Sequence, residues 1–100
     1  MNNLNMNIFR NKKKELENLK LQIFEKFYID TIKTIELHAN NLKEFCIYQI
    51  PLFVFGKSNY NISEAIIYLK NKLDNDINNG NLKEVIIYEP NILYISWSLD

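Results

Sequence analysis

The sequence predicts an α+β domain in which a small three-stranded antiparallel sheet carries helices on one face. Three observations support this. An amphipathic pattern with helical spacing begins near residue 11, a second begins at a capping motif near residue 61, and residues 83–99 hold two β-rich runs, the second of which alternates with the two-residue period of a strand. The expected order is α(α)βαββ, with the first helical region counted as one helix or two. Residues 11–100 are expected to form a single domain.

Residues 1–10 are rich in asparagine and lack a periodic pattern, which predicts a flexible N-terminal arm. From residue 11 onward, apolar residues recur at spacings of three and four, as on one face of a helix. Asp30 and Thr31 are suitable caps for a second helix, so residues 11–40 form either one long helix or two. The apolar positions that define the stripe are Leu16, Leu19, Ile23 and Phe27.

A helix of this length carries more apolar surface than a small sheet can cover. We therefore expect a protein partner, or a second copy of the chain, to bind through the N-terminal helix. Phe24 and Tyr28 widen its apolar stripe; they are candidate protein contacts, and the alternative is that they pack on the domain itself. Tyr60, Tyr88 and Tyr94 are the other candidates, because surface tyrosines are common in protein interfaces.

Residues 44–50 are rich in β-forming side chains, and Pro51 removes the next backbone donor, so a strand should end there. Phe53 and Phe55 either extend this strand past a bulge or fill the core from a loop. The sequence of this region leaves both alternatives open.

A helix is predicted to begin at Asn61, whose side chain can accept from a first-turn amide while Glu64 reaches back; Ser63 is an alternative cap. The helix should end at Asn79-Gly80, where glycine suits the left-handed position after a helix. Its apolar face comprises Ile62, Ile66, Leu69, Leu73 and Ile77.

Two β-rich runs, 85–88 and 92–97, are joined by Glu89-Pro90-Asn91, which predicts a hairpin because Pro90 presets φ and Asn91 tolerates turn conformations. Every second residue from Leu93 to Leu99 is apolar, so one face of the sheet should be buried. We expect Trp97 to lie beneath the preceding helix.

Twelve basic residues balance twelve acidic ones, so net charge points to no particular partner. The distribution is uneven, since residues 1–14 hold four basic residues and no acid, whereas residues 74–100 hold five acids and one lysine. The single Cys46 excludes an internal disulfide and fits a reducing compartment. The longest uncharged apolar run, 45–56, is too short to cross a bilayer, so no membrane partner is expected.

Residues suited to catalysis or metal binding are scarce. His38 is the only histidine and is expected at a helix C-terminus, where positive charge is favoured. A dyad with Cys46 would be accidental, and one cysteine with one histidine falls short of a zinc site. Gly56-Lys57-Ser58 lacks the upstream glycine of a phosphate loop. We therefore expect no enzymatic activity, no metal and no cofactor.

A nucleic-acid-binding function is the alternative, because the element order also occurs in winged-helix domains. Asp74 and Asp76 lie beside the lysines of the helix at 62–77, which makes that surface nearly neutral and weakens this interpretation. The candidate nucleic-acid contacts are Arg10, Lys12, Lys13, Lys14, Lys57, Lys70 and Lys72.

Several local patterns resemble a known family. They include Cys46 with Tyr48-Gln49-Ile50-Pro51, then Phe53-Val54-Phe55-Gly56, and above all the closing run Pro90-Asn91-Ile92-Leu93-Tyr94-Ile95-Ser96-Trp97. Over residues 32–97 the chain resembles short, uncharacterised proteins of nucleocytoplasmic large DNA viruses. It departs from them at Ser58, where they usually have proline, and at Asn79-Gly80-Asn81, where Asn-Gly-Phe is usual.

The resemblance implies a viral origin and no known enzymatic role. It agrees with the heavy use of asparagine and isoleucine, a bias typical of an AT-rich genome. We expect a non-enzymatic protein of the host cytoplasm or the virion that acts in protein interaction, as a minor virion or assembly component. Winged-helix-like binding of nucleic acid is the alternative.

Overall fold

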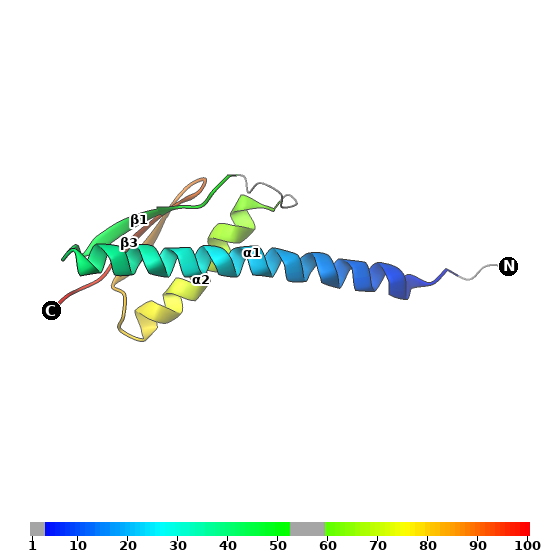
Figure 1. Ribbon diagram of the computed structural model, residues 1–100, viewed down its shortest axis with the longest axis horizontal. Helices are drawn as coiled ribbons and strands as arrows, with labels where there is room; N and C mark the ends of the chain where they lie inside the picture. The colour runs from blue at the N-terminus through cyan, green and yellow to red at the C-terminus, as the bar shows by residue number, and fades with distance from the viewer. Residues whose placement is uncertain (1–3, 53–59) are drawn as a thin grey trace.

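The structure, a computed structural model, describes residues 4–52 and 60–100. It confirms the predicted α+β class, with two helices and a three-stranded antiparallel sheet (Figure 1). In chain order the elements are α1 (Met6–Asn40), β1 (Phe45–Gln49), α2 (Ile62–Asn78), β2 (Glu84–Tyr88) and β3 (Ile92–Ser96).

The N-terminal region forms one continuous helix, which decides between the two alternatives for residues 11–40. Helix α1 begins at Met6, so the predicted start at residue 11 is wrong and residues 6–10 are helical. The Asn5 side chain caps the helix by accepting from the Asn7 amide at 3.0 Å. Thr31 starts no second helix, because its hydroxyl donates to the Phe27 carbonyl oxygen of the preceding turn at 2.7 Å.

The sheet has the strand order β1-β3-β2, with β3 in the centre and both pairings antiparallel. Cys46, Ile95 and Val85 lie in one register row across the sheet. All three are buried, and they belong to the inner face that both helices cover. Helix α1 packs over β1, and α2 packs over β2.

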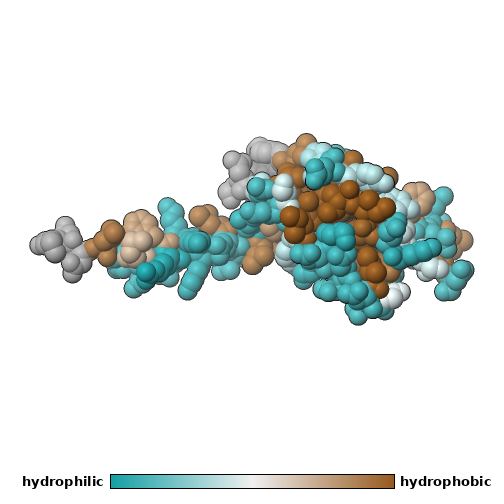
Figure 2. Space-filling model, turned by 180° about the vertical axis from the view of Figure 1, so that it is seen from behind, coloured by the Kyte–Doolittle hydropathy of each residue, from teal (hydrophilic) through white to brown (hydrophobic). Residues whose placement is uncertain are grey.

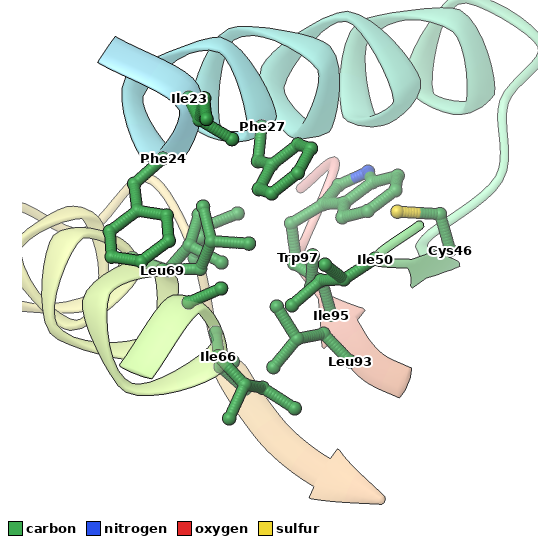
Figure 3. Packing of buried hydrophobic residues seen from close by; sticks show 14 residues of the cluster. Ile23, Phe24, Phe27, Cys46, Ile50, Ile66, Leu69, Leu93, Ile95 and Trp97 are labelled. Carbon is green, nitrogen blue, oxygen red and sulfur yellow. The ribbon is translucent and has the colours of Figure 1, made fainter. Parts of the chain in front are cut away.

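The core lies between the two helices and the inner face of the sheet. In Figure 3, Phe27 from α1, Leu69 from α2 and Ile95 from β3 point toward a common centre. Trp97 is 5% exposed, which confirms its predicted burial. Its indole sits close to Cys46 in the same view (Figure 3).

Helix α2 follows its predicted signals closely. Asn61 is the N-cap and its Oδ1 accepts from the Glu64 amide at 3.2 Å. Gly80 adopts φ 81°, the left-handed conformation that ends the helix. The helix that these local signals delimit packs on β2 with Ala65, Ile66, Leu69 and Leu73 buried.

The molecule is elongated because half of α1 extends beyond the sheet and α2 (Figure 1). It measures 70 × 28 × 22 Å, with a radius of gyration of 17.4 Å. A compact chain of this length would have a radius of about 13 Å. The excess length comes from the N-terminal half of one helix.

Candidate interaction surfaces

Residues 6–19 of α1, here called the stem, project from the body of the molecule (Figure 1). Every stem residue is exposed, and the first buried residue of α1 is Ile23. Contact with the body begins at Lys20, whose Nζ lies 2.9 Å from Glu64 Oε2. Because most helical stability in proteins comes from packing, a stem without packing contacts among the described residues is a surface suited to a partner.

The stem continues the apolar stripe that enters the core. Leu16 and Leu19 are 53% and 48% exposed, whereas Ile23, on the same face one turn later, is 9% exposed. Phe9 lies seven residues before Leu16, so it belongs to this face as well, and it is 55% exposed. The same periodic pattern therefore serves the core at one end of α1 and faces outward at the other.

Basic side chains share the stem with this stripe. Arg10, Lys12, Lys13 and Lys14 are all exposed and lie on a single helical segment without an acidic neighbour before Glu15. Among the described residues, neither helix combines the length and apolarity required to cross a membrane. The stem thus combines apolar and cationic groups on one projecting helix.

A polar network fixes the direction in which the stem leaves the body. The Tyr68 hydroxyl of α2 donates to Glu25 Oε2 of α1 at 2.6 Å, and the Tyr28 hydroxyl of α1 donates to Asp76 Oδ2 at 2.9 Å. Lys72 lies between them, 3.4 Å from Glu25 Oε2 and 5.4 Å from the Tyr28 ring centroid. These contacts tie α1 to α2 immediately beyond the stem.

The network also shifts the pKa values of its members. The hydrogen bond from Tyr68, and then the charge of Lys72, lower the pKa of Glu25. Burial, followed by the hydrogen bond to Glu25, raises the pKa of Tyr68 to about 12. Burial and the hydrogen bond to Asp76 raise the pKa of Tyr28 to about 12. The network therefore holds an ionised carboxyl against neutral phenols at neutral pH.

The second candidate surface is the outer face of the sheet, which faces away from both helices. Its residues alternate with the buried ones, and no described segment covers them. Phe45 and Ile47 of β1 are 50% and 57% exposed, and Tyr88 of β2 is 54% exposed. The Phe45 and Tyr94 rings stack with centroids 5.8 Å apart. The other apolar members, Ile86 and Ile92, are half-buried between these neighbours.

Figure 2 views the molecule from the side turned away from α1 and shows a contiguous apolar area on the body with hydrophilic side chains around it. An open hollow of about 550 Å³ lies where β1 begins and β3 ends. Its charged lining residues are Glu44, Lys83 and Glu84, beside Phe45 and Tyr94 of the outer face. The outer face is therefore bordered at this end by two carboxylates and one lysine.

The structure places the predicted protein contacts in four environments. Phe24 is 3% exposed and packs on Tyr68, so it belongs to the core and is unavailable as a surface contact. Tyr60 is half-buried against Phe27, with its hydroxyl bonded to the Pro51 carbonyl oxygen. Tyr28 belongs to the interhelical network. Tyr88 and Tyr94 lie together on the outer sheet face.

The predicted nucleic-acid contacts are divided as well. Lys70 lies 2.6 Å from Asp74 Oδ1, and Lys72 pairs with Glu25, so both lysines of α2 form ion pairs with acids of the same chain at the surface. The basic residues of the stem are separate from them. Lys57, like Phe53, Phe55 and the Gly56-Lys57-Ser58 sequence, lies outside the described residues.

His38 and Cys46 line one open hollow of about 320 Å³ together with Lys43, Phe45 and Ile47. His38 lies in the last turn of α1, as predicted, and its Nδ1 is 2.8 Å from the Thr34 carbonyl oxygen. Cys46 is 1% exposed, and burial raises the pKa of its thiol to about 11. Within residues 4–52 and 60–100, no three His, Cys, Asp or Glu side chains are grouped to hold a metal ion.

The outer face of the sheet was not identified from the sequence as an exposed apolar surface. A signal for it exists, because Phe45 and Ile47 alternate with the buried Cys46, and Ile86 and Ile92 occupy the same side of the other strands. The sequence predicted one buried face and a half-polar opposite face, and only Tyr88 and Tyr94 of that opposite face were named as candidate contacts. Both faces are instead largely apolar, as expected for a sheet that is covered on both sides.

The long helix and the small sheet define an α+β protein. Comparison with known families shows which family the chain belongs to. The chain belongs to a family of unknown function, DUF5759, which matches residues 4–74. It is also similar to the uncharacterized protein R447 of Acanthamoeba polyphaga mimivirus, with 38% identity over 85 residues, covering 83% of this chain and 67% of that protein. No solved structure matches.

These relationships confirm the resemblance to uncharacterised proteins of large DNA viruses. They do not confirm the Pro90–Trp97 motif, which was the main basis of the resemblance. The family match ends at residue 74, before this motif begins. The match begins at residue 4 and so includes the stem, which the resemblance over residues 32–97 left out.

Proposed function

We propose that this viral protein is a non-enzymatic interaction component, such as a minor virion or assembly protein, and that it binds its partner through the stem. One observation carries the proposal. The apolar stripe of α1 is buried from Ile23 onward but remains exposed at Phe9, Leu16 and Leu19. Contiguous exposed apolar surface on a helix is typical of a protein interface.

The interhelical network supports this function. A helix that docks a partner must be held at a defined angle, since flexible attachment adds an entropic cost to binding. Glu25, Tyr68 and Lys72 hold α1 immediately beyond the stem. The helix is therefore held at a defined angle where the stem leaves the body, which directs the apolar side of the stem.

The test is affinity recovery of partners from infected cells with the full chain and with Leu16→Glu. The substitution places a charge in the exposed stripe and should abolish recovery of stem-dependent proteins. Leu37→Glu is the matched control, because Leu37 lies on the same helix, is 61% exposed and is outside the stem. Equal recovery by wild type and Leu16→Glu, with no difference in self-association, would refute the proposal.

Binding of nucleic acid by Arg10, Lys12, Lys13 and Lys14 is the second candidate, favoured by their exposure on the projecting stem. It predicts duplex DNA binding that weakens steeply with added salt, because phosphate contacts release counterions. Fluorescence anisotropy with a labelled duplex at low and moderate salt measures it. Absence of binding at low ionic strength would remove this function, winged-helix-like or otherwise.

A further inference from the structure

We propose that the partner of the stem is a second copy of this chain, and that the stem of each copy lies across the outer sheet face of the other in a reciprocal, twofold-symmetric dimer. This inference rests on the proposed function and names the partner. It joins two exposed apolar surfaces of the same molecule, the stripe at Phe9, Leu16 and Leu19 and the face at Phe45 and Ile47.

The two surfaces match in size. Fourteen helical residues form a rod about 21 Å long and about 10 Å wide, a footprint of about 210 Å². Three strands of five residues cover about 240 Å², with a length of about 17 Å. One stem therefore covers one outer sheet face with little excess on either side.

The direction of the chain brings opposite charges together. Strand β1 runs back along α1, so Phe45 lies near the C-terminal end of that helix (Figure 1). In a twofold dimer with antiparallel α1 helices, the partner's stem runs parallel to β1 and its N-terminal part reaches the Phe45 end of the sheet. Residues 10–14 would then lie over the hollow whose charged lining is Glu44, Glu84 and one lysine, Lys83, an excess of one negative charge.

The charge balance of the two surfaces favours this arrangement. Residues 4–14 carry four basic side chains and no acid. The ends and edges of the sheet carry Glu44, Glu84, Glu89 and Asp100 against Lys43 and Lys83. Complementary charges at the rim guide register and orientation more than they add affinity. A parallel pairing of two stems would instead place the two basic segments side by side.

Because the contact is reciprocal, each copy buries two surfaces, which brings the interface closer to the area that a stable dimer needs. Each copy contributes a stem and a sheet face, a projected area of about 450 Å² before the relief of the side chains is included. A stable interface buries about 800 Å² of accessible surface per partner. A dimer formed by two stems alone would bury only the stem footprint of each copy, which is less than half of this projected area.

The first experiment measures the mass of the full chain in solution by light scattering over a wide concentration range. Wild type should reach twice the 12.0 kDa chain mass. Leu16→Glu on the stem and Ile47→Glu on the sheet face should each weaken dimerisation by about tenfold or more, since each change falls twice in the symmetric interface. Leu37→Glu should leave the dimer unchanged. Circular dichroism establishes that each variant is folded.

Mixing the two interface variants gives the sharpest result. A mixed dimer keeps one intact stem-on-sheet contact, so Leu16→Glu and Ile47→Glu should associate with each other more strongly than either does with itself. An Ile47→Glu chain that dimerises as well as wild type would overturn the arrangement in favour of stem pairing. A Leu16→Glu chain that does so would overturn it in favour of sheet pairing.

Carbodiimide cross-linking of mixed ¹⁴N- and ¹⁵N-labelled wild-type chains tests the register without a substitution. Links between residues 12–14 of one chain and Glu44 or Glu84 of the other are expected. The Lys20–Glu64 pair, at 2.9 Å, is the positive control within one chain. Intrachain links alone would overturn the dimer. A monomeric wild type that still recovers another protein through Leu16 overturns this inference and leaves the proposed function standing.

Discussion

Asn91 and Ile50 exchange two hydrogen bonds beyond the last register pair of β1 and β3. The Ile50 amide donates to the Asn91 carbonyl oxygen at 2.8 Å, and Asn91 Nδ2 donates to the Ile50 carbonyl oxygen at 2.8 Å. Asn91 is 4% exposed, although it stands in the hairpin turn. Its side chain thus satisfies a backbone acceptor where β1 ends before Pro51, and it holds the hairpin to the edge strand.

Asn91→Ala should therefore lower the free energy of unfolding by about 1–3 kcal/mol, because the Ile50 carbonyl oxygen loses its donor in a buried position. Urea denaturation followed by tryptophan fluorescence measures the change. Asn81→Ala, at an exposed position, is the control and should stay within about 0.5 kcal/mol of wild type. Equal stability of the two variants would contradict the role of the Asn91 side chain.

Leu42 occupies a position that glycine usually fills. Helix α1 ends in a Schellman motif, in which the Lys43 amide donates to the His38 carbonyl oxygen and the Leu42 amide to that of Ala39, both at 2.9 Å. Leu42 has φ 63° and is 81% exposed, so it bears left-handed strain without burying its side chain.

Leu42→Gly should raise the free energy of unfolding by roughly 1 kcal/mol, since a left-handed residue with a Cβ atom costs about 1–2 kcal/mol and glycine gives back part of this as backbone entropy. Leu37→Gly, inside the same helix, should lower it by a similar amount. Thermal unfolding of both variants checks the opposite signs. A loss of stability in Leu42→Gly would show that the side chain makes a stabilising contact.

Alkaline pH should destabilise the protein between about pH 10 and 12. The pKa values of Tyr28, Tyr48 and Tyr68 are raised from 10.0 to about 12, mainly by burial. The three neutral tyrosine side chains contribute their full share to the free energy of unfolding below pH 10. This share is lost as the pH rises through their pKa values in the folded state. Thermal unfolding midpoints measured across this range should fall steeply.

Tyr68→Phe distinguishes the effect of the hydrogen-bond network on the pH dependence of stability from the effect of burial alone. The substitution should make the alkaline loss of stability less steep, because one raised pKa is removed. It should also remove the hydrogen bond that is the main cause of the lowered pKa of Glu25. In wild type, the lowered pKa of Glu25 adds to the stability of the folded state above pH 4.5, and this stability is lost as the pH falls. The variant should therefore lose less additional stability in acid than wild type does. Tyr88→Phe controls for removal of a hydroxyl outside the network.

The Cys46 thiol should be inert in the native state. It is 1% exposed, and burial raises its pKa to about 11, so little thiolate forms near neutral pH. Labelling with a chromogenic disulfide should be slow in buffer and accelerate with urea in parallel with unfolding. Rapid labelling without denaturant would mean that β1 separates from α1 locally. Cys46→Ala provides the blank.

The sequence was informative wherever a rule acts over a few residues. The cap at Asn61, the left-handed Gly80 and the alternation from Leu93 to Trp97 each depend on close neighbours. They predicted α2, the hairpin and the buried tryptophan, and with them the fold class. The same rules placed the start of the first helix too late, because Asn5 acts as a cap within a stretch that has no apolar period.

The candidate surfaces depended on contacts between residues far apart in the chain. The same stripe on α1 is buried at Ile23 and exposed at Leu16, and only the position of the body along the helix makes the difference. Likewise, Glu25 and Tyr68 meet because two helices cross, and Phe45 faces outward because both helices occupy the opposite face of the sheet. Periodicity specifies which residues share a face. Tertiary packing decides which faces have a neighbour.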